Sequence, residues 1–171
     1  GFTTNPSLMK KAGITSYIGF AKEVLKDIKE FHVSFEVFAD DIETMEKEAE
    51  KIASLGENVY VKIPVTNSKG ESTVDLMKRL AAKGVKINAT AIFTLEQVCE
   101  VVGALKAGTP GIVSVFAGRI ADTGVDPVPI MKEALSICRQ KDGVELLWAS
   151  PRETNNIYQA DELGVDIITC T

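Results

Sequence analysis

The stretch Val59-Tyr60-Val61-Lys62-Ile63-Pro64-Val65 decides the fold and raises the first question about function. Its apolar, β-branched character is typical of a strand that is buried on both faces, as in parallel sheets. Lys62 interrupts it, and lysine is almost never fully buried unless it is paired or has a chemical role. Burial disfavours the charged ammonium, and a neutral amine attacks carbonyl groups, so Lys62 is a candidate Schiff-base residue. The alternative, on this stretch alone, is a lysine whose ammonium reaches water at the strand end.

Similar apolar runs recur along the chain and alternate with amphipathic stretches. We predict seven strands, at 2–5, 32–39, 59–65, 86–93, 111–118, 144–150 and 165–171, and helices at 16–30, 41–55, 71–83, 94–107, 127–141 and 151–163. Asp40, Thr94 and Asp126 are residue types that begin helices, and Pro127 suits a first helical turn. Strands that alternate with helices in this way indicate parallel βαβ units. The predicted fold is therefore α/β, of the TIM (β/α)₈ barrel type.

The two ends of the chain bear on how complete this barrel is. A barrel of this type has eight strands, and seven are visible here. The sequence opens directly in one predicted strand and stops in another. We therefore expect a single barrel domain over residues 1–171 that lacks its first strand and its last helix.

Composition excludes several classes of partner. The chain has 24 acidic residues against 19 Lys plus Arg, with no long block of either sign, which argues against nucleic acid and anionic membranes. No apolar run approaches the roughly 20 residues that span a bilayer. Cys99, Cys138 and Cys170 are far apart and lack metal-ligand spacing, so we expect reduced thiols in a cytoplasmic protein. His32 has no nearby Cys or His partner, and we expect no metal site.

Polar residues recur at the period of the βα unit. Exactly the same interval, 26 residues, separates Glu36 from Lys62, Lys62 from Asn88, and Asn88 from Ser114. Because strand side chains alternate between two faces, polar residues two positions apart share a face. On this basis we predict four same-face pairs, namely Ser34 with Glu36, Asn88 with Thr90, Ser114 with Phe116, and Trp148 with Ser150. In a closed sheet these faces point inward and line one pocket near the carboxyl ends of the strands, where barrel active sites lie. The alternative is a set of polar core residues, each satisfied locally.

The residue types in this predicted pocket suit carbonyl and sugar chemistry. Glu36 beside Lys62 could hold a catalytic water or act as a general acid or base, and Thr90 could position the same water. Asn88 and Ser114 offer uncharged hydrogen-bond partners for sugar hydroxyls. We expect these five residues to act together.

Two arginines are candidates for binding a phosphate group. Arg119 and Arg152 each lie where a predicted strand gives way to a loop, and two guanidiniums at one rim could clamp a phosphate. Ser150 and the start of the helix at 151–163 could add hydroxyl and backbone N–H donors. Ordinary surface arginines in salt bridges are the alternative.

Four segments of the sequence resemble signature segments of the transaldolase family. They are Thr3-Thr4-Asn5-Pro6-Ser7-Leu8, Val61-Lys62-Ile63-Pro64-Val65-Thr66, Asn88-Ala89-Thr90 and Gly118-Arg119-Ile120, in the order and spacing of the family. The similarity extends over essentially the whole chain. It implies a class I aldolase-type (β/α)₈ barrel that acts on sugar phosphates and uses neither a metal nor another cofactor.

The resemblance also implies roles for single residues. Lys62 matches the Schiff-base lysine, and Glu36 matches the carboxylate that holds the catalytic water with Thr90. The remaining matches are to residues that bind substrate: Asn5 and Asn88 toward the donor sugar, Ser114 toward a hydroxyl, and Arg119, Ser150 and Arg152 toward the phosphate. We also expect Thr4 and Phe116 to bind substrate.

Two positions separate the subtypes of the family. The small fructose-6-phosphate aldolases carry glutamine at the position of Glu36 and tyrosine at that of Phe116, so this chain has the transaldolase-like residues. We therefore expect transfer of a dihydroxyacetone unit through a lysine Schiff base. The alternatives are an aldolase that releases dihydroxyacetone and a catalytically silent phosphosugar-binding barrel.

Two segments of the family pattern are missing from this sequence. One is the first-strand aspartate, the usual proton-transfer partner, so the activity of the chain by itself is open. The other is the final helix, which helps to hold the ring-shaped oligomer together in small family members. We expect a homo-oligomer for the full-length protein.

Overall fold

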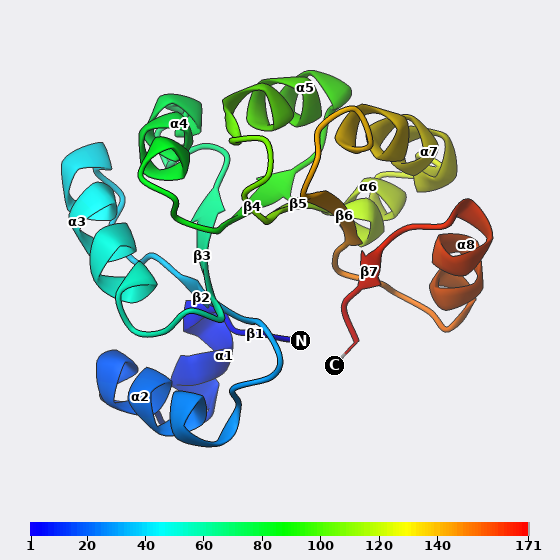
Figure 1. Ribbon diagram of the computed structural model, residues 1–171. Coiled ribbons are helices and arrows are strands. Elements are labelled where there is room, and N and C mark those ends of the chain that lie inside the picture. Colours follow the sequence, from blue (N-terminus) through cyan, green and yellow to red (C-terminus); the bar gives the residue numbers. More distant parts are fainter. Residues whose placement is uncertain (171) are drawn as a thin grey trace.

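The computed structural model describes residues 1–170, which form a curved parallel sheet surrounded by helices (Figure 1). The seven strands follow one another in chain order across the sheet. They are β1 (Phe2–Thr3), β2 (Val33–Glu36), β3 (Val59–Pro64), β4 (Ile87–Ile92), β5 (Gly111–Val115), β6 (Val144–Trp148) and β7 (Ile167–Ile168). This order with parallel pairing throughout is that of a (β/α) barrel, which confirms the predicted fold class.

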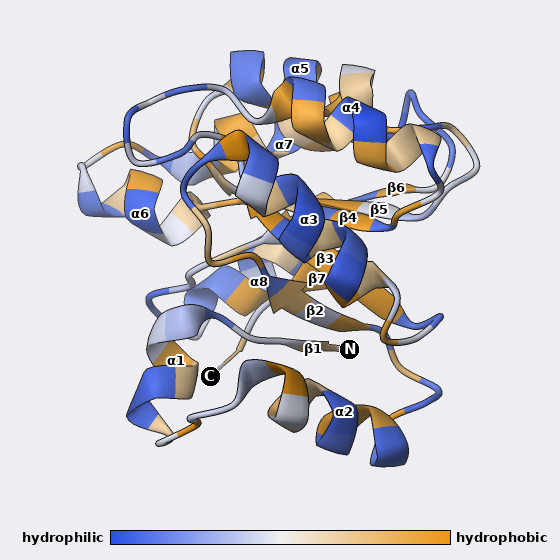
Figure 2. Ribbon diagram, turned by 90° about the vertical axis from the view of Figure 1, so that its left-hand side faces the viewer, coloured by the Kyte–Doolittle hydropathy of each residue, from blue (hydrophilic) through white to orange (hydrophobic). Residues whose placement is uncertain are grey.

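The helices cover the outer face of the sheet. They are α1 (Pro6–Lys11), α2 (Tyr17–Asp27), α3 (Ile42–Ala53), α4 (Val74–Ala82), α5 (Leu95–Ala104), α6 (Ala117–Asp122), α7 (Pro127–Cys138) and α8 (Asn155–Leu163). In α3 the buried residues Met45, Ala49 and Ile52 recur at helical spacing and form one apolar stripe. Figure 2 shows apolar strands enclosed by helices with hydrophilic outward faces.

Two separate hydrophobic clusters follow from this arrangement. The large one lies between the sheet and the helices and includes Phe35 and Trp148. The small one lies inside the curved sheet and is built on Tyr60, Ile112 and Leu147. The inner cluster is small because polar side chains occupy much of the inner face.

The register places the central polar residues side by side. Glu36 on β2 is paired with Lys62 on β3, and Lys62 is paired with Asn88 on β4. The repeat of 26 residues therefore reflects direct neighbours across three strands. Ser114 differs, because the partner of Asn88 on β5 is Ile112, two residues before Ser114.

The predicted elements are found, with two short helices added. All seven predicted strands exist, although each is shorter than predicted, and Thr171 at the end of the last one lies outside the described residues. The predicted strand at 111–118 was too long, since α6 begins at Ala117. The helix α1 was not predicted, although Asn5 accepts a hydrogen bond from the Leu8 N–H and Pro6 follows it, an ordinary helix start. Helix α3 begins after Asp41, one residue later than the predicted Asp40.

The sheet is open on one side. Within residues 1–170, β1 pairs only with β2 and β7 pairs only with β6, and the two chain ends face each other across the opening (Figure 1). Among the same residues, no helix combines the length and apolarity needed to cross a membrane.

Candidate active site

A cavity of about 430 Å³ lies at the carboxyl ends of the strands, inside the curved sheet. Eight of the predicted site residues line it: Thr4, Asn5, Lys62, Asn88, Thr90, Ser114, Phe116 and Ser150. Lys62 is the one charged side chain among the described residues that line it. The cavity thus presents an amine together with hydroxyl and amide groups, and apolar side chains such as Leu147 complete its lining.

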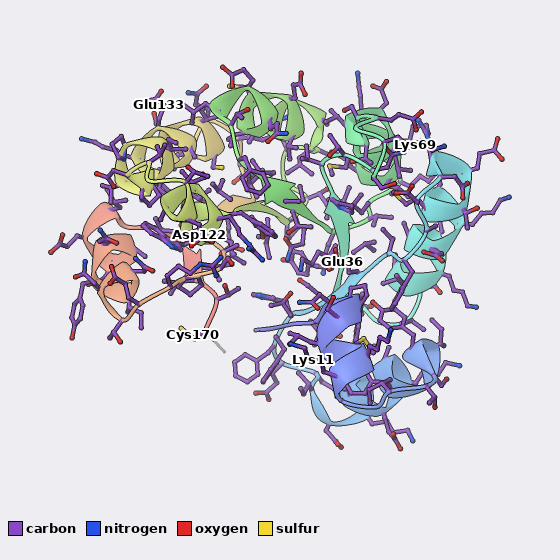
Figure 3. All side chains as sticks on the ribbon, turned by 180° about the vertical axis from the view of Figure 1, so that it is seen from behind. Lys11, Glu36, Lys69, Asp122, Glu133 and Cys170 are labelled. Carbon is purple, nitrogen blue, oxygen red and sulfur yellow. The ribbon has the colours of Figure 1, made fainter. Side chains whose placement is uncertain are left out.

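Lys62 and Glu36 form an ion pair beside the cavity, which Lys62 lines and Glu36 does not. The distance between Lys62 Nζ and Glu36 Oε2 is 3.1 Å, and the two side chains are only 13% and 17% exposed. Their direct pairing across β2 and β3 brings the two groups together. The carboxylate lies close enough to exchange a proton with the amine or with a molecule bound to it. Figure 3 labels Glu36, the last residue of β2.

Asn88 is the centre of a buried hydrogen-bond network. Its Nδ2 donates to Ser34 Oγ over 3.0 Å, and its Oδ1 accepts from Ser114 Oγ over 2.7 Å. All three side chains are 1–3% exposed. The network joins β2, β4 and β5 behind Lys62 and fixes the orientation of the Asn88 amide.

Thr90 carries a buried hydroxyl that has no partner in the described structure. Its Oγ1 is inaccessible to solvent and makes no hydrogen bond there, although Thr90 lines the cavity. Such a group is expected to bond to a water or a ligand. The next residue, Ala91, has φ 58°, and the register of β4 against β5 shifts there. This bulge leaves Thr90 facing inward and turns Ile92 into the outer core.

The end of β6 departs from the predicted alternation. We predicted that Trp148 and Ser150 share the inward face, and this is wrong for Trp148, which packs in the outer core while Leu147 and Ala149 line the cavity. Ser150 reaches the cavity because its backbone is left-handed, with φ 62°. A non-glycine residue in this conformation costs on the order of 1 kcal/mol or more and is typical of functional sites.

The two predicted phosphate-binding arginines converge on Asp122, outside the cavity lining. Arg152 donates from Nε and Nη2 to the two carboxylate oxygens of Asp122, over 2.9 and 2.6 Å, and from Nη1 to Ser150 Oγ over 3.1 Å. Arg119 Nη1 lies 3.9 Å from Asp122 Oδ2. The predicted donors at the start of α8 are engaged, because Arg152 and Glu153 both donate their backbone N–H to Asn156 Oδ1.

Comparison with known proteins agrees with this geometry. The family model described as "Transaldolase/Fructose-6-phosphate aldolase" matches residues 1–171. The chain belongs to this family. Among curated relatives, probable transaldolases from Parabacteroides distasonis and Thermoanaerobacter sp. are each 36% identical over 99% of the chain, which covers 76% and 74% of those proteins. One from Methanococcus maripaludis is 38% identical over 99% of the chain and 74% of its own length.

Membership of the transaldolase/fructose-6-phosphate aldolase family assigns the chain a transaldolase-type function. Within the described residues, no group of three His, Cys, Asp or Glu side chains could hold a metal ion. The family resemblance inferred from the sequence is confirmed, and the roles of single residues remain predictions.

Several residues of this transaldolase-family site were not predicted. Thr169 and Cys170 line the cavity from the far end of the chain, and no sequence pattern marks them. Tyr17 on α2 donates its hydroxyl to the Glu36 carbonyl over 2.7 Å, and burial raises the pKa of this phenol well above its usual value. Asp122 could have been noticed, because a carboxylate three residues after Arg119 on a helix can reach it.

Proposed function

We propose that this protein transfers a dihydroxyacetone unit between sugar phosphates through a Schiff base on Lys62. The observation that carries the proposal is an amine 3.1 Å from a carboxylate, on the wall of a cavity otherwise lined by uncharged groups. Covalent catalysis by lysine needs an amine, a neighbouring group that moves protons and a space for the carbonyl substrate. The transaldolase-type function of the family supports the same assignment.

The proposed reaction begins at the carbonyl group of a ketose phosphate. Lys62 Nζ attacks C2 after giving up a proton, and the carbinolamine loses water to form a protonated imine. The C3–C4 bond then breaks, its electrons pass into the imine, and the C4 hydroxyl proton goes to a base. An aldose phosphate leaves, and a three-carbon enamine stays bound to Lys62.

The second half-reaction reverses these steps on an acceptor. The enamine carbon attacks the aldehyde carbon of an aldose phosphate, whose oxygen takes up a proton, and a new C–C bond forms. Water then adds to the imine and releases the product ketose and the free amine. In this scheme Glu36 and Thr90 hold that water, and the unpartnered Thr90 hydroxyl supports the assignment.

The uncharged residues are assigned to the hydroxyl groups of the sugar. Asn88 and Ser114 contribute through the network that fixes the Asn88 amide. Thr4 and Asn5 line the cavity from the first strand and the start of α1, and Phe116 forms an apolar part of the wall. Arg119, Arg152 and Ser150 form the proposed phosphate subsite at the rim.

Borohydride trapping tests the central step of this proposal. The protein is incubated with fructose 6-phosphate, reduced with borohydride, digested and examined by peptide mass spectrometry. We expect a three-carbon adduct on the peptide that holds Lys62. Lys62→Met should abolish it, whereas Lys78→Met, at an exposed position on α4, should leave it unchanged.

The other results discriminate among the candidates. An adduct of the intact sugar on Lys62 means binding without C–C cleavage, which contradicts transfer. Turnover without any acceptor aldehyde assigns the aldolase reaction instead. Absence of any Lys62 adduct, in protein that is folded by circular dichroism, sinks the Schiff-base mechanism.

A further inference from the structure

Asp122 connects the two arginines of the proposed phosphate subsite. It ends α6, where Figure 3 labels it. Arg152 contacts it from the segment before α8. The carboxylate makes a bidentate contact with Arg152 at 2.9 and 2.6 Å and lies 3.9 Å from Arg119. A bidentate contact of this kind fixes the plane of a guanidinium as well as its position.

Arg152 keeps two N–H donors that these contacts do not use. A guanidinium has five N–H donors, of which Asp122 takes two and Ser150 takes one. One N–H on Nη1 and one on Nη2 are left. Two neighbouring donors match two oxygens of a phosphate group.

The same contacts place the Nη1 side of the guanidinium beside a residue of the cavity lining. Ser150 accepts a hydrogen bond from Nη1 and also lines the cavity, so that side of the guanidinium faces the cavity rim. Asp122 holds the opposite side, at Nε and Nη2. The carboxylate and the hydroxyl thereby restrain a side chain that would otherwise sample many rotamers in water.

We propose that Asp122 is a positioning residue for phosphate recognition. It orients Arg152 and keeps Arg119 nearby, so that a phosphorylated sugar meets a preformed pair of guanidiniums. The inference rests on the proposed function, because it assigns the phosphate subsite of that same site. It adds a residue whose own charge is opposite to that of the arginines that bind the ligand.

Asp122 also has an effect that weakens phosphate binding. Its negative charge repels a phosphate, so electrostatics alone predicts tighter phosphate binding when the charge is removed. Asp122 and Arg119 are 44% and 61% exposed, and water and salt weaken such interactions between exposed charges. The bidentate hydrogen bonds between Asp122 and Arg152 act at contact distances of 2.9 and 2.6 Å, so salt screens them less than it screens the longer-range repulsion between Asp122 and a phosphate. We therefore expect positioning to dominate, increasingly so as ionic strength rises.

Calorimetric titration with inorganic phosphate tests this inference on the whole chain. Asp122→Asn should weaken phosphate binding about tenfold, equivalent to about 1.4 kcal/mol. The loss should persist at about 1 M salt, where the Debye length is about 3 Å. Asp122→Glu should recover part of the affinity. Asp142→Asn, an exposed residue between α7 and β6, is the control for the same change of charge.

A second measurement separates positioning from a general structural effect. Borohydride trapping of fructose, which lacks the phosphate, should give the same Lys62 adduct yield in Asp122→Asn as in the unmodified chain. A variant that damages the fold would lose both readouts.

The outcomes are distinct. Unchanged or tighter phosphate binding in Asp122→Asn overturns the positioning role. If the unmodified chain does not bind phosphate, the subsite and the inference both fail. A fructose adduct on Lys62 would still support the Schiff base in that case, so the two failures can be told apart.

Discussion

Lys62 is held inside the barrel by a single carboxylate. Breaking a buried ion pair by removing one partner typically costs about 3–5 kcal/mol, because the other charge is left uncompensated. Glu36 therefore stabilises the lysine as well as offering a proton acceptor, at a distance of 3.1 Å. The pair illustrates how one side chain can serve both the fold and the proposed chemistry.

A different carboxyl group is expected to weaken the fold at neutral pH. Burial, together with the charge of Asp166, raises the pKa of Glu145 above its ordinary value of 4.5. Between pH 4.5 and the raised pKa of Glu145, the folded state binds more protons than the unfolded state. The free energy of unfolding therefore falls as pH rises through this range. The penalty grows as pH rises above 4.5 and is absent at pH values well below 4.5.

Glu145→Gln should therefore raise the melting temperature at pH 7, by about 1–3 °C for a chain of this size. The difference should disappear in acid, where Glu145 is protonated in both states. Thermal unfolding at a series of pH values measures this, with Glu133→Gln on the outer surface as the control (Figure 3). A gain that is the same at every pH would contradict the electrostatic explanation.

At the scale of elements, the segments that follow β5 and β6 are in direct contact. Gly118 in the first turn of α6 approaches the backbone of Ser150 so closely that a Cβ there would lie 1.6 Å from the Ser150 carbonyl oxygen. The Gly118 N–H also donates to the Ala149 carbonyl over 3.3 Å. This contact sets the relative position of Arg119 and Ser150, the two sides of the proposed phosphate subsite.

Gly118→Ala should accordingly lower the free energy of unfolding by about 1–3 kcal/mol, as overpacking of a tight contact does. Chemical denaturation measures the change. Gly103→Ala on α5 is the matched control, because a Cβ there meets nothing within 4 Å and alanine should add about 0.5–1 kcal/mol to helix stability. If both variants behave alike, the close approach at Gly118 has no energetic consequence.

The elements also show which parts of the site could be predicted from sequence. The interval of 26 residues correctly grouped Glu36, Lys62 and Asn88 as neighbours, because β2, β3 and β4 pair in regular register where the three residues lie. Period-two alternation was less reliable. The alternation was wrong for Trp148, which packs in the outer core. Ser150 reaches the cavity because its backbone is left-handed, and no local sequence pattern predicts that conformation.

The residues that mark helix starts in the sequence predicted some helices and missed others. Thr94 and Asp126 cap their helices as predicted, with side chains that accept hydrogen bonds from the first turn. Helix α6 has no side-chain cap at Phe116, so its start carries no such signal. Its first turn instead contacts Ala149 and Ser150, which follow β6 and are remote in sequence.

At the scale of the whole molecule, the cavity is assembled from both ends of the chain. Thr3, Thr4 and Asn5 line it from the beginning, and Thr169 and Cys170 from the end. The strands that carry these ends, β1 and β7, are two residues long, and within residues 1–170 each pairs with one neighbour only. Their backbone amides are thus expected to open more readily than those of β3, β4 and β5.

A ligand in this cavity would hold β1 and β7 together, two strands that do not pair with each other within residues 1–170. Amide hydrogen exchange should be fastest at β1 and β7, and fructose 6-phosphate should slow it at both together, because binding to the closed form opposes local opening. Slowing at one end alone would show that the ligand contacts one wall only. If exchange slows at both strands, the substrate stabilises β1 and β7 as well as reacting. Local opening of these strands would then be rarest while substrate is bound.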